Sequence, residues 1–105
     1  MAHSSKRKAN RHEREIVHAA EDHDSLSGIR AYASNGESIG EVKECDVLVS
    51  GEDHELRIQA KRRASIASYL NPPDGTDCVV VREDRGPNLA VLPLADLLDL
   101  IGGDT

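Results

Sequence analysis

The sequence predicts a mixed α/β fold in a single domain, with the element order helix, three strands, short helix, two strands, helix. Three observations support this prediction. Apolar residues recur at helical spacing near the N-terminus and again near the C-terminus. Between them, short alternating or β-branched segments are separated by Gly, Pro and Asn, which favour turns. A chain of 105 residues has room for one such domain.

The first half is expected to form a helix followed by a three-strand meander. Residues 1–8 are polar and basic and predict a flexible arm ahead of a domain covering residues 9–105. From about Asn10 to His23, the apolar stripe Ile16, Val17 and Ala20 predicts a helix that turns Glu13 inward. The segment GIRAYAS predicts the first strand, and strands at about 45–50 and 55–61 form a hairpin through the turn SGED.

The second half is expected to add a short helix, two strands and a closing helix. ASIASYL predicts the short helix, which NPPDG ends. CVVVR and LAVL predict two strands separated by the turn EDRGPN. Pro93 suits the first turn of the closing helix, whose apolar residues recur at helical spacing up to Ile101.

Charge is distributed unevenly along the chain. The net charge is −6, but eight of the thirteen basic residues fall in two clusters. These clusters are Lys6, Arg7, Lys8, Arg11 and Arg14, and then Lys61, Arg62 and Arg63. Since phosphate binding depends on neutralisation by Lys and Arg, the clusters keep nucleic acid open as a partner. The acidic remainder, poor in aromatics, is typical of a halophilic protein, although an acidic bacterial protein has a similar composition.

The cysteines and the hydropathy of the chain indicate where in the cell the protein is expected. Cys45 and Cys78 are accompanied by no CxxC motif, and we expect both to be buried thiols. The longest apolar stretch is too short and too broken to span a bilayer, and no signal-peptide pattern opens the chain. We therefore expect a cytoplasmic protein with no membrane association.

Four residues occur in an order that suits metal-dependent phosphodiester hydrolysis. This chemistry needs hard oxygen ligands around Mg²⁺ and a nearby cation. Gln59 and Lys61 share one face of a strand, because side chains alternate with period two. Asp46 begins the neighbouring strand, and Glu13 approaches from the helix. Each residue alone also suits an ordinary surface or strand-end position. The hypothesis of a metal site therefore depends on all four residues occurring in this order.

The motifs resemble those of the PD-(D/E)xK nuclease superfamily, and within it the archaeal Holliday-junction resolvases and their viral relatives. The likeness rests on RKANRHERE at 7–15, IRAYAS at 29–34, and Asp46 followed by IQAK at 58–61. The tail VVVREDRGPNLAVLPLADLLDLI is similar to the C-terminal halves of small resolvase-like nucleases of phages and archaea. The resemblance implies a restriction-endonuclease-like fold, a mixed five-stranded sheet flanked by helices.

The resemblance also implies a role for each matched residue. Glu13, Asp46 and Gln59 would surround Mg²⁺, or Mn²⁺ in its place, and Lys61 would be the catalytic cation. Ser34 would act at the scissile phosphate, and Arg14 and Arg30 would contact the DNA backbone near it. From the two basic clusters we also expect these residues to bind DNA: Lys6, Arg7, Lys8, Arg11, Arg62 and Arg63. The family's enzymes are homodimers that make paired nicks in branched double-stranded DNA during recombination and repair.

Three departures from the family pattern qualify this reading. Gln59 stands where the family has Glu. An amide oxygen can still bind Mg²⁺, but it carries no negative charge, so the affinity for the metal should fall. Glu37, Glu41 or Glu44 could restore a carboxylate. The segment between Lys61 and CVVV is shorter than in the resolvases, and the loop between Ser34 and Asp46 is longer.

Four functions therefore remain open. The leading hypothesis is a junction resolvase, and the next is a nuclease of the same superfamily that acts in nicking, repair or restriction. The third is a catalytically weakened DNA-binding module in which Gln59 marks the lost site. The fourth, a structural interaction protein, leaves both basic clusters unexplained.

Overall fold

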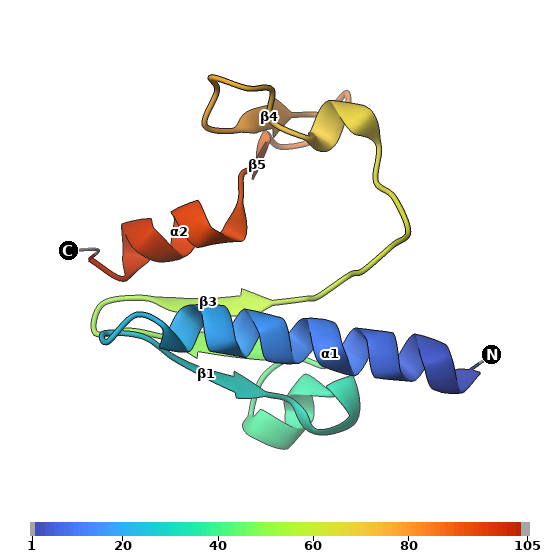
Figure 1. Cartoon of the computed structure of the whole chain (residues 1–105), viewed down its shortest axis with the longest axis vertical. Helices are drawn as coiled ribbons and strands as arrows, with labels where there is room; N and C mark the ends of the chain where they lie inside the picture. The colour runs from blue at the N-terminus through green and yellow to red at the C-terminus, as the bar shows by residue number, and fades with distance from the viewer. Residues whose placement is uncertain (1, 104–105) are drawn as a thin grey trace.

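The computed structural model describes residues 2–103, except for the side chains of residues 2–5 and Ser34. Figure 1 shows one long helix lying along a small sheet, with a second, separate sheet and a short helix formed by the C-terminal part of the chain. The elements are, in chain order, α1 (Ala2–Glu21), β1 (Ser27–Arg30), β2 (Val47–Ser50), β3 (Glu55–Ile58), β4 (Val79–Val81), β5 (Leu89–Val91) and α2 (Leu94–Ile101). The expected mixed α/β class and the order of its main elements are confirmed.

The five strands form two sheets, so the expected five-stranded mixed sheet is wrong. β1, β2 and β3 make one antiparallel sheet in that order, and β4 pairs only with β5, also antiparallel. β3 ends at Ile58, and the chain then crosses a basic, proline-containing segment before β4 begins. The turn between β4 and β5 pairs these short strands locally, whereas joining the larger sheet requires closing a much longer loop.

α1 begins earlier than its apolar stripe predicts. It starts at Ala2 rather than near Asn10, so residues 2–8, expected as an arm, form its first turns. The helix ends at Glu21. Its inward face is the expected one, since Ile16 and Ala20 are buried and Glu13 is only 2% exposed.

The hydrophobic core lies where α1, β2 and α2 meet. Val47 and Val49 of β2 and Leu98 of α2 are completely buried, and Ile16 and Ala20 of α1 pack against them. α2 is tied to the chain after α1 by a contact of 2.7 Å between Nε2 of His23 and Oδ1 of Asp99.

A glycine allows α1 to lie close to β1. A Cβ placed on Gly28 would stand 3.2 Å from the Cα of Val17, tighter than most such contacts. The residues of β1 that follow, up to Arg30, are therefore held directly beneath α1.

Three local predictions differ from the structure. The strand predicted for GIRAYAS ends at Arg30, and Tyr32–Ser34 and Gly36–Ile39 form 3₁₀ turns instead. The helix expected in ASIASYL is reduced to the single 3₁₀ turn Ser68–Leu70. Cys45 is buried as expected, but Cys78 is exposed. Within residues 2–103, no helix is both long and apolar enough to cross a membrane.

Candidate functional site

Glu13 is a buried carboxylate on the sheet-facing side of α1. Its Oε1 accepts a hydrogen bond from Nε of Arg30 on β1, at 3.3 Å. Nη2 of the same guanidinium donates to Oδ1 of Asn10, also at 3.3 Å. A buried charge is costly unless it is paired, so Arg30 stabilises Glu13 and fixes its direction. Arg30, expected at the DNA backbone, thus holds the expected metal ligand.

Asp46 is buried immediately before β2, where the strand pairing is irregular. Its backbone N–H donates to the C=O of Ile58 at 2.8 Å, although the register partner of Ile58 is Val47. Two successive residues thus oppose one, which is the arrangement of a β-bulge. Cys45, Asp46 and Val47 are consecutively buried, with Asp46 at 9% exposure, so the period-two alternation is broken. Bulges of this kind redirect side chains.

The Asp46 carboxylate reaches the segment that carries Gln59 and Lys61. Its Oδ2 accepts a hydrogen bond from the backbone N–H of Ala60 at 2.8 Å. Ala60 is partly buried, while Gln59 and Lys61 on either side of it are exposed. Asp46 is thus adjacent to the QAK segment through the backbone of Ala60, but the strand expected to reach residue 61 ends at Ile58, so Gln59 and Lys61 do not share a strand face.

Backbone and side-chain hydrogen bonds link Glu13 to this segment through β1 and β2. Arg30 binds Glu13, and the next residue, Ala31, donates its N–H to the C=O of Asp46 at 2.9 Å. The two buried carboxylates therefore lie at the same end of the three-stranded sheet. Within the described part of the chain, no three His, Cys, Asp or Glu side chains are grouped closely enough to hold a metal by themselves.

The loop carboxylates considered as replacements have other surroundings. Oε1 of Glu41 lies 2.6 Å from Nε of Arg57 on β3, and Glu55 contacts the same guanidinium at 3.0 Å. Hydrogen bonding to Glu41, and then its charge, raises the pKa of Arg57 above its ordinary value. Glu37 and Glu44 are exposed in the loop. Glu41 therefore pairs with a cation on the outer face of β3.

Lys8 of the first basic cluster and all three residues of the second line one cavity of about 400 Å³ between α1 and the segment after β3. Its walls are formed by Lys8, Ala9, His12, Ala60, Lys61, Arg62, Arg63 and Ala64. Ala60 belongs to this wall and also donates to Asp46, so the cavity adjoins the buried carboxylate. Sequence reasoning missed His12, although its spacing of four residues from Lys8 places the two on one side of a helix.

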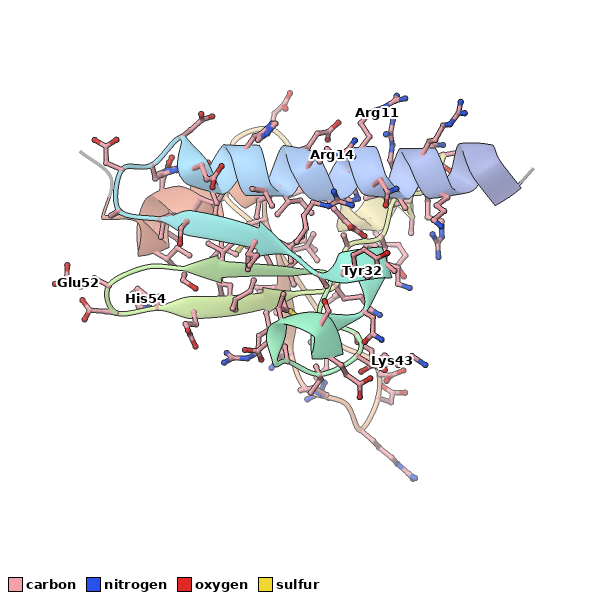
Figure 2. All side chains as sticks on the ribbon, turned by 90° about the horizontal axis from the view of Figure 1, so that it is seen from below. Arg11, Arg14, Tyr32, Lys43, Glu52 and His54 are labelled. Atoms are coloured by element: carbon pink, nitrogen blue, oxygen red, sulfur yellow. The ribbon has the colours of Figure 1, made fainter. Side chains whose placement is uncertain are left out.

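The remaining basic residues of α1 lie on different sides of the helix. Arg7, Arg11 and Arg14 are exposed, and their spacing of four and three residues puts them on one outward stripe. Figure 2 shows Arg11 extending from α1 on the side away from the sheet. Lys6 instead lines a second hollow, together with Arg30. The side chain of Ser34, expected at the scissile phosphate, lies outside the described residues.

Comparisons with known proteins identified no relative of this chain. No family model, no curated protein and no solved structure matches the chain.

Proposed function

We propose that the chain is a Mg²⁺-dependent DNA endonuclease organised like the PD-(D/E)xK enzymes, with four-way junctions as its substrate. One observation carries the proposal. The buried carboxylate of Asp46 is hydrogen-bonded to the backbone of Ala60, between Gln59 and Lys61, at the end of the sheet where α1 buries Glu13. Asp46 adjoins the cationic cavity through Ala60, and Glu13 is paired with Arg30 at the same end of the sheet. Apolar residues in place of buried, paired charges are often more stable, which supports a use for the two carboxylates.

The donor chemistry at this end of the sheet fits Mg²⁺. Glu13 and Asp46 supply carboxylate oxygens and Gln59 an amide oxygen, which are the hard ligands that the ion prefers. Bound Mg²⁺ polarises a phosphoryl oxygen and lowers the pKa of a coordinated water. Gln59 is exposed beside Asp46, so its side chain is free to turn toward an ion there. Its neutral amide makes the affinity for metal lower than a Glu at the same position would.

The chain's own cations would hold the substrate. Lys61 is attached directly to Ala60 and faces the cavity that also receives Lys8 and Arg62. A phosphodiester in this cavity would be neutralised from α1 and from the segment after β3 at the same time. Arg30 acts as a positioning residue, because it contacts Glu13 rather than the cavity. Two copies of the chain, in a homodimer, would cut the two opposed strands of a junction.

The proposal is tested by cleavage of defined DNA substrates. Purified protein is given an immobile four-way junction, a linear duplex and a flap, each with Mg²⁺ or Mn²⁺, at low and at high salt. Paired symmetric nicks confined to the junction are expected. Cleavage of the duplex or the flap alone would keep the nuclease and exclude the junction as substrate. Absence of cleavage with either metal at either salt concentration would overturn the proposal.

A second candidate is a DNA-binding module with a weakened site. It is favoured by the neutral Gln59, and by the observation that the described side chains include no cluster of three metal-binding carboxylates, His or Cys. Tight junction binding without cleavage under all the conditions above would support this candidate. The buried Glu13 and Asp46 weigh against it, since a site that had lost its metal would gain stability from apolar replacements.

A further inference from the structure

A second hollow, of about 500 Å³, lies on the other side of α1 from the basic cavity. It is formed by Lys6 and Asn10 of α1, by residues 30–33 at the end of β1, and by Ser38 and Ile39 of the following loop. A volume of this size suits one nucleotide. The hollow adjoins the proposed active centre, because Arg30 in its wall contacts Glu13.

Tyr32 is held at the edge of this hollow with its side chain 82% exposed. Its backbone is fixed on both sides: the N–H donates to Oγ of Ser38 at 2.8 Å, and the C=O accepts from the N–H of Asn35 at 3.0 Å. The next residue, Ala33, has φ of 51°, in the left-handed region that is strained for a residue with a Cβ. A strained, hydrogen-bonded turn therefore presents an aromatic ring to solvent.

The position of Tyr32 suits contact with DNA at the active centre. Figure 2 places Tyr32 at the end of the sheet opposite to the β2–β3 turn, which carries Glu52 and His54. This is the end at which Asp46 and Glu13 are buried. Of the two cationic side chains that line the hollow, Arg30 is paired with Glu13, so the attraction for an anionic ligand comes from Lys6.

We propose that this hollow takes one unpaired nucleotide of the DNA, with the base stacked on Tyr32 and its phosphate beside Lys6. The idea rests on the proposed function: every base of an intact four-way junction is paired, so opening of one pair at the branch point would supply the nucleotide next to the strand that is cut. Stacking on aromatic rings is tolerant of sequence, because every base has a π-face. The Asn10 side chain, which accepts from Arg30, places an amide in the same wall.

The other tyrosine of the chain provides a matched control. Tyr69 is 70% exposed, but it lines a separate hollow that also contains Arg82 and Glu83. That hollow carries no net excess of positive charge and lies on the β4–β5 sheet. The chain contains no Trp and only these two Tyr residues. In the variant Tyr69→Phe, Tyr32 is therefore the sole source of tyrosine emission, and in Tyr32→Phe it is Tyr69.

The experiment follows tyrosine emission while a short single-stranded oligothymidylate is added to each variant. In Tyr69→Phe, the emission of Tyr32 should be quenched by the oligonucleotide. In Tyr32→Phe, the emission of Tyr69 should not fall by more than the inner-filter correction accounts for. Tyr32→Ala should weaken oligothymidylate binding by roughly 5- to 150-fold, the range that loss of one stacked base gives. Tyr32→Phe should retain the affinity because it retains a ring, and Tyr69→Ala should bind like the unaltered chain. Far-UV circular dichroism checks that Tyr32→Ala is folded.

The outcomes separate this inference from the proposed function. If the protein cleaves junctions but Tyr32 emission does not change on DNA binding, base stacking at Tyr32 is overturned and the nuclease stands. If Tyr32 emission is quenched and no metal supports cleavage, the nucleotide site stands and the nuclease is overturned. Equal loss of affinity in Tyr32→Ala and Tyr69→Ala would also overturn the assignment, because it would show no preference for this hollow.

Discussion

Nε of Arg30 lies 3.3 Å from Oε1 of Glu13, so that a cation of β1 and a buried carboxylate of α1 form an ion pair beneath the helix. The pair joins the two elements that Gly28 allows to pack closely. It holds the Glu13 carboxylate at the end of the sheet where Asp46 is also buried. The relationship makes Arg30 a structural partner of the proposed metal site.

Replacing Arg30 by Met should destabilise the fold. The substitution removes a charged hydrogen-bond partner of a buried carboxylate, which lowers the free energy of unfolding by about 1–3 kcal/mol. Urea unfolding measures the change, and Arg14→Met, on the exposed side of α1, is the matched control and should unfold like the unaltered chain. If Glu13→Gln combined with Arg30→Met restores no stability relative to Arg30→Met alone, the two residues are not coupled.

Asp46→Asn should abolish cleavage while the protein still binds junction DNA. The amide keeps an oxygen that can accept from the Ala60 N–H, so the fold should be retained, but it removes the negative charge needed beside Mg²⁺. Gel-shift and cleavage assays on the same junction separate the two effects. The control is Asp53→Asn in the exposed β2–β3 turn, which should cut normally. An Asp46→Asn variant that cuts at the normal rate is incompatible with the site.

Gln59→Glu should lower the concentration of Mg²⁺ that gives half-maximal cleavage. Gln59 is exposed and next to the Ala60 N–H that binds Asp46, so an added carboxylate would increase negative charge at the metal without disturbing the core. Titration of Mg²⁺ at fixed junction concentration measures the shift. Loss of activity in this variant would show that the neutral amide itself is required.

Lys8→Gln should reduce the salt dependence of DNA binding. If Lys8 contacts one phosphate in the basic cavity, the slope of log K against log salt should decrease in magnitude by about one. Binding of a junction measured over a series of salt concentrations gives this slope. Arg82→Gln serves as the control and should leave the slope unchanged, because Arg82 follows β4 and lines the separate hollow that contains Tyr69. Equal slopes for Lys8→Gln and the unaltered chain would remove Lys8 from the interface.

Leu98→Ala should destabilise the domain far more than Leu100→Ala. Leu98 is completely buried where α2 packs on the core, while Leu100 on the same helix is 73% exposed. Truncating a buried Leu lowers the free energy of unfolding by about 2–5 kcal/mol. Chemical denaturation of both variants provides the comparison. Similar stabilities would mean that α2 does not dock on the core as the structure shows.

Local periodicity predicted much of the first half of the fold. The helical spacing of Ile16 and Ala20 was enough to predict that Glu13 faces inward, because all three residues lie on one side of α1. The hairpin of β2 and β3 followed from two apolar segments around a Gly-containing turn. The single five-stranded sheet implied by the family resemblance was wrong, and strand patterns alone do not specify which strands pair across a long connection.

For the candidate site, too, some features were predicted from the sequence and others were decided by tertiary contacts. Local sequence patterns predicted that Glu13 faces inward and that Gln59 and Lys61 stand two residues apart. They placed Asp46 inside a strand at about 45–50, whereas β2 begins at Val47. Tertiary structure alone decided that a bulge buries Asp46, that Arg30 pairs with Glu13, and that Lys8 meets Lys61 in one cavity. The first group depends on periodicity within one element. The second depends on contacts between elements distant in the sequence, which no local pattern encodes.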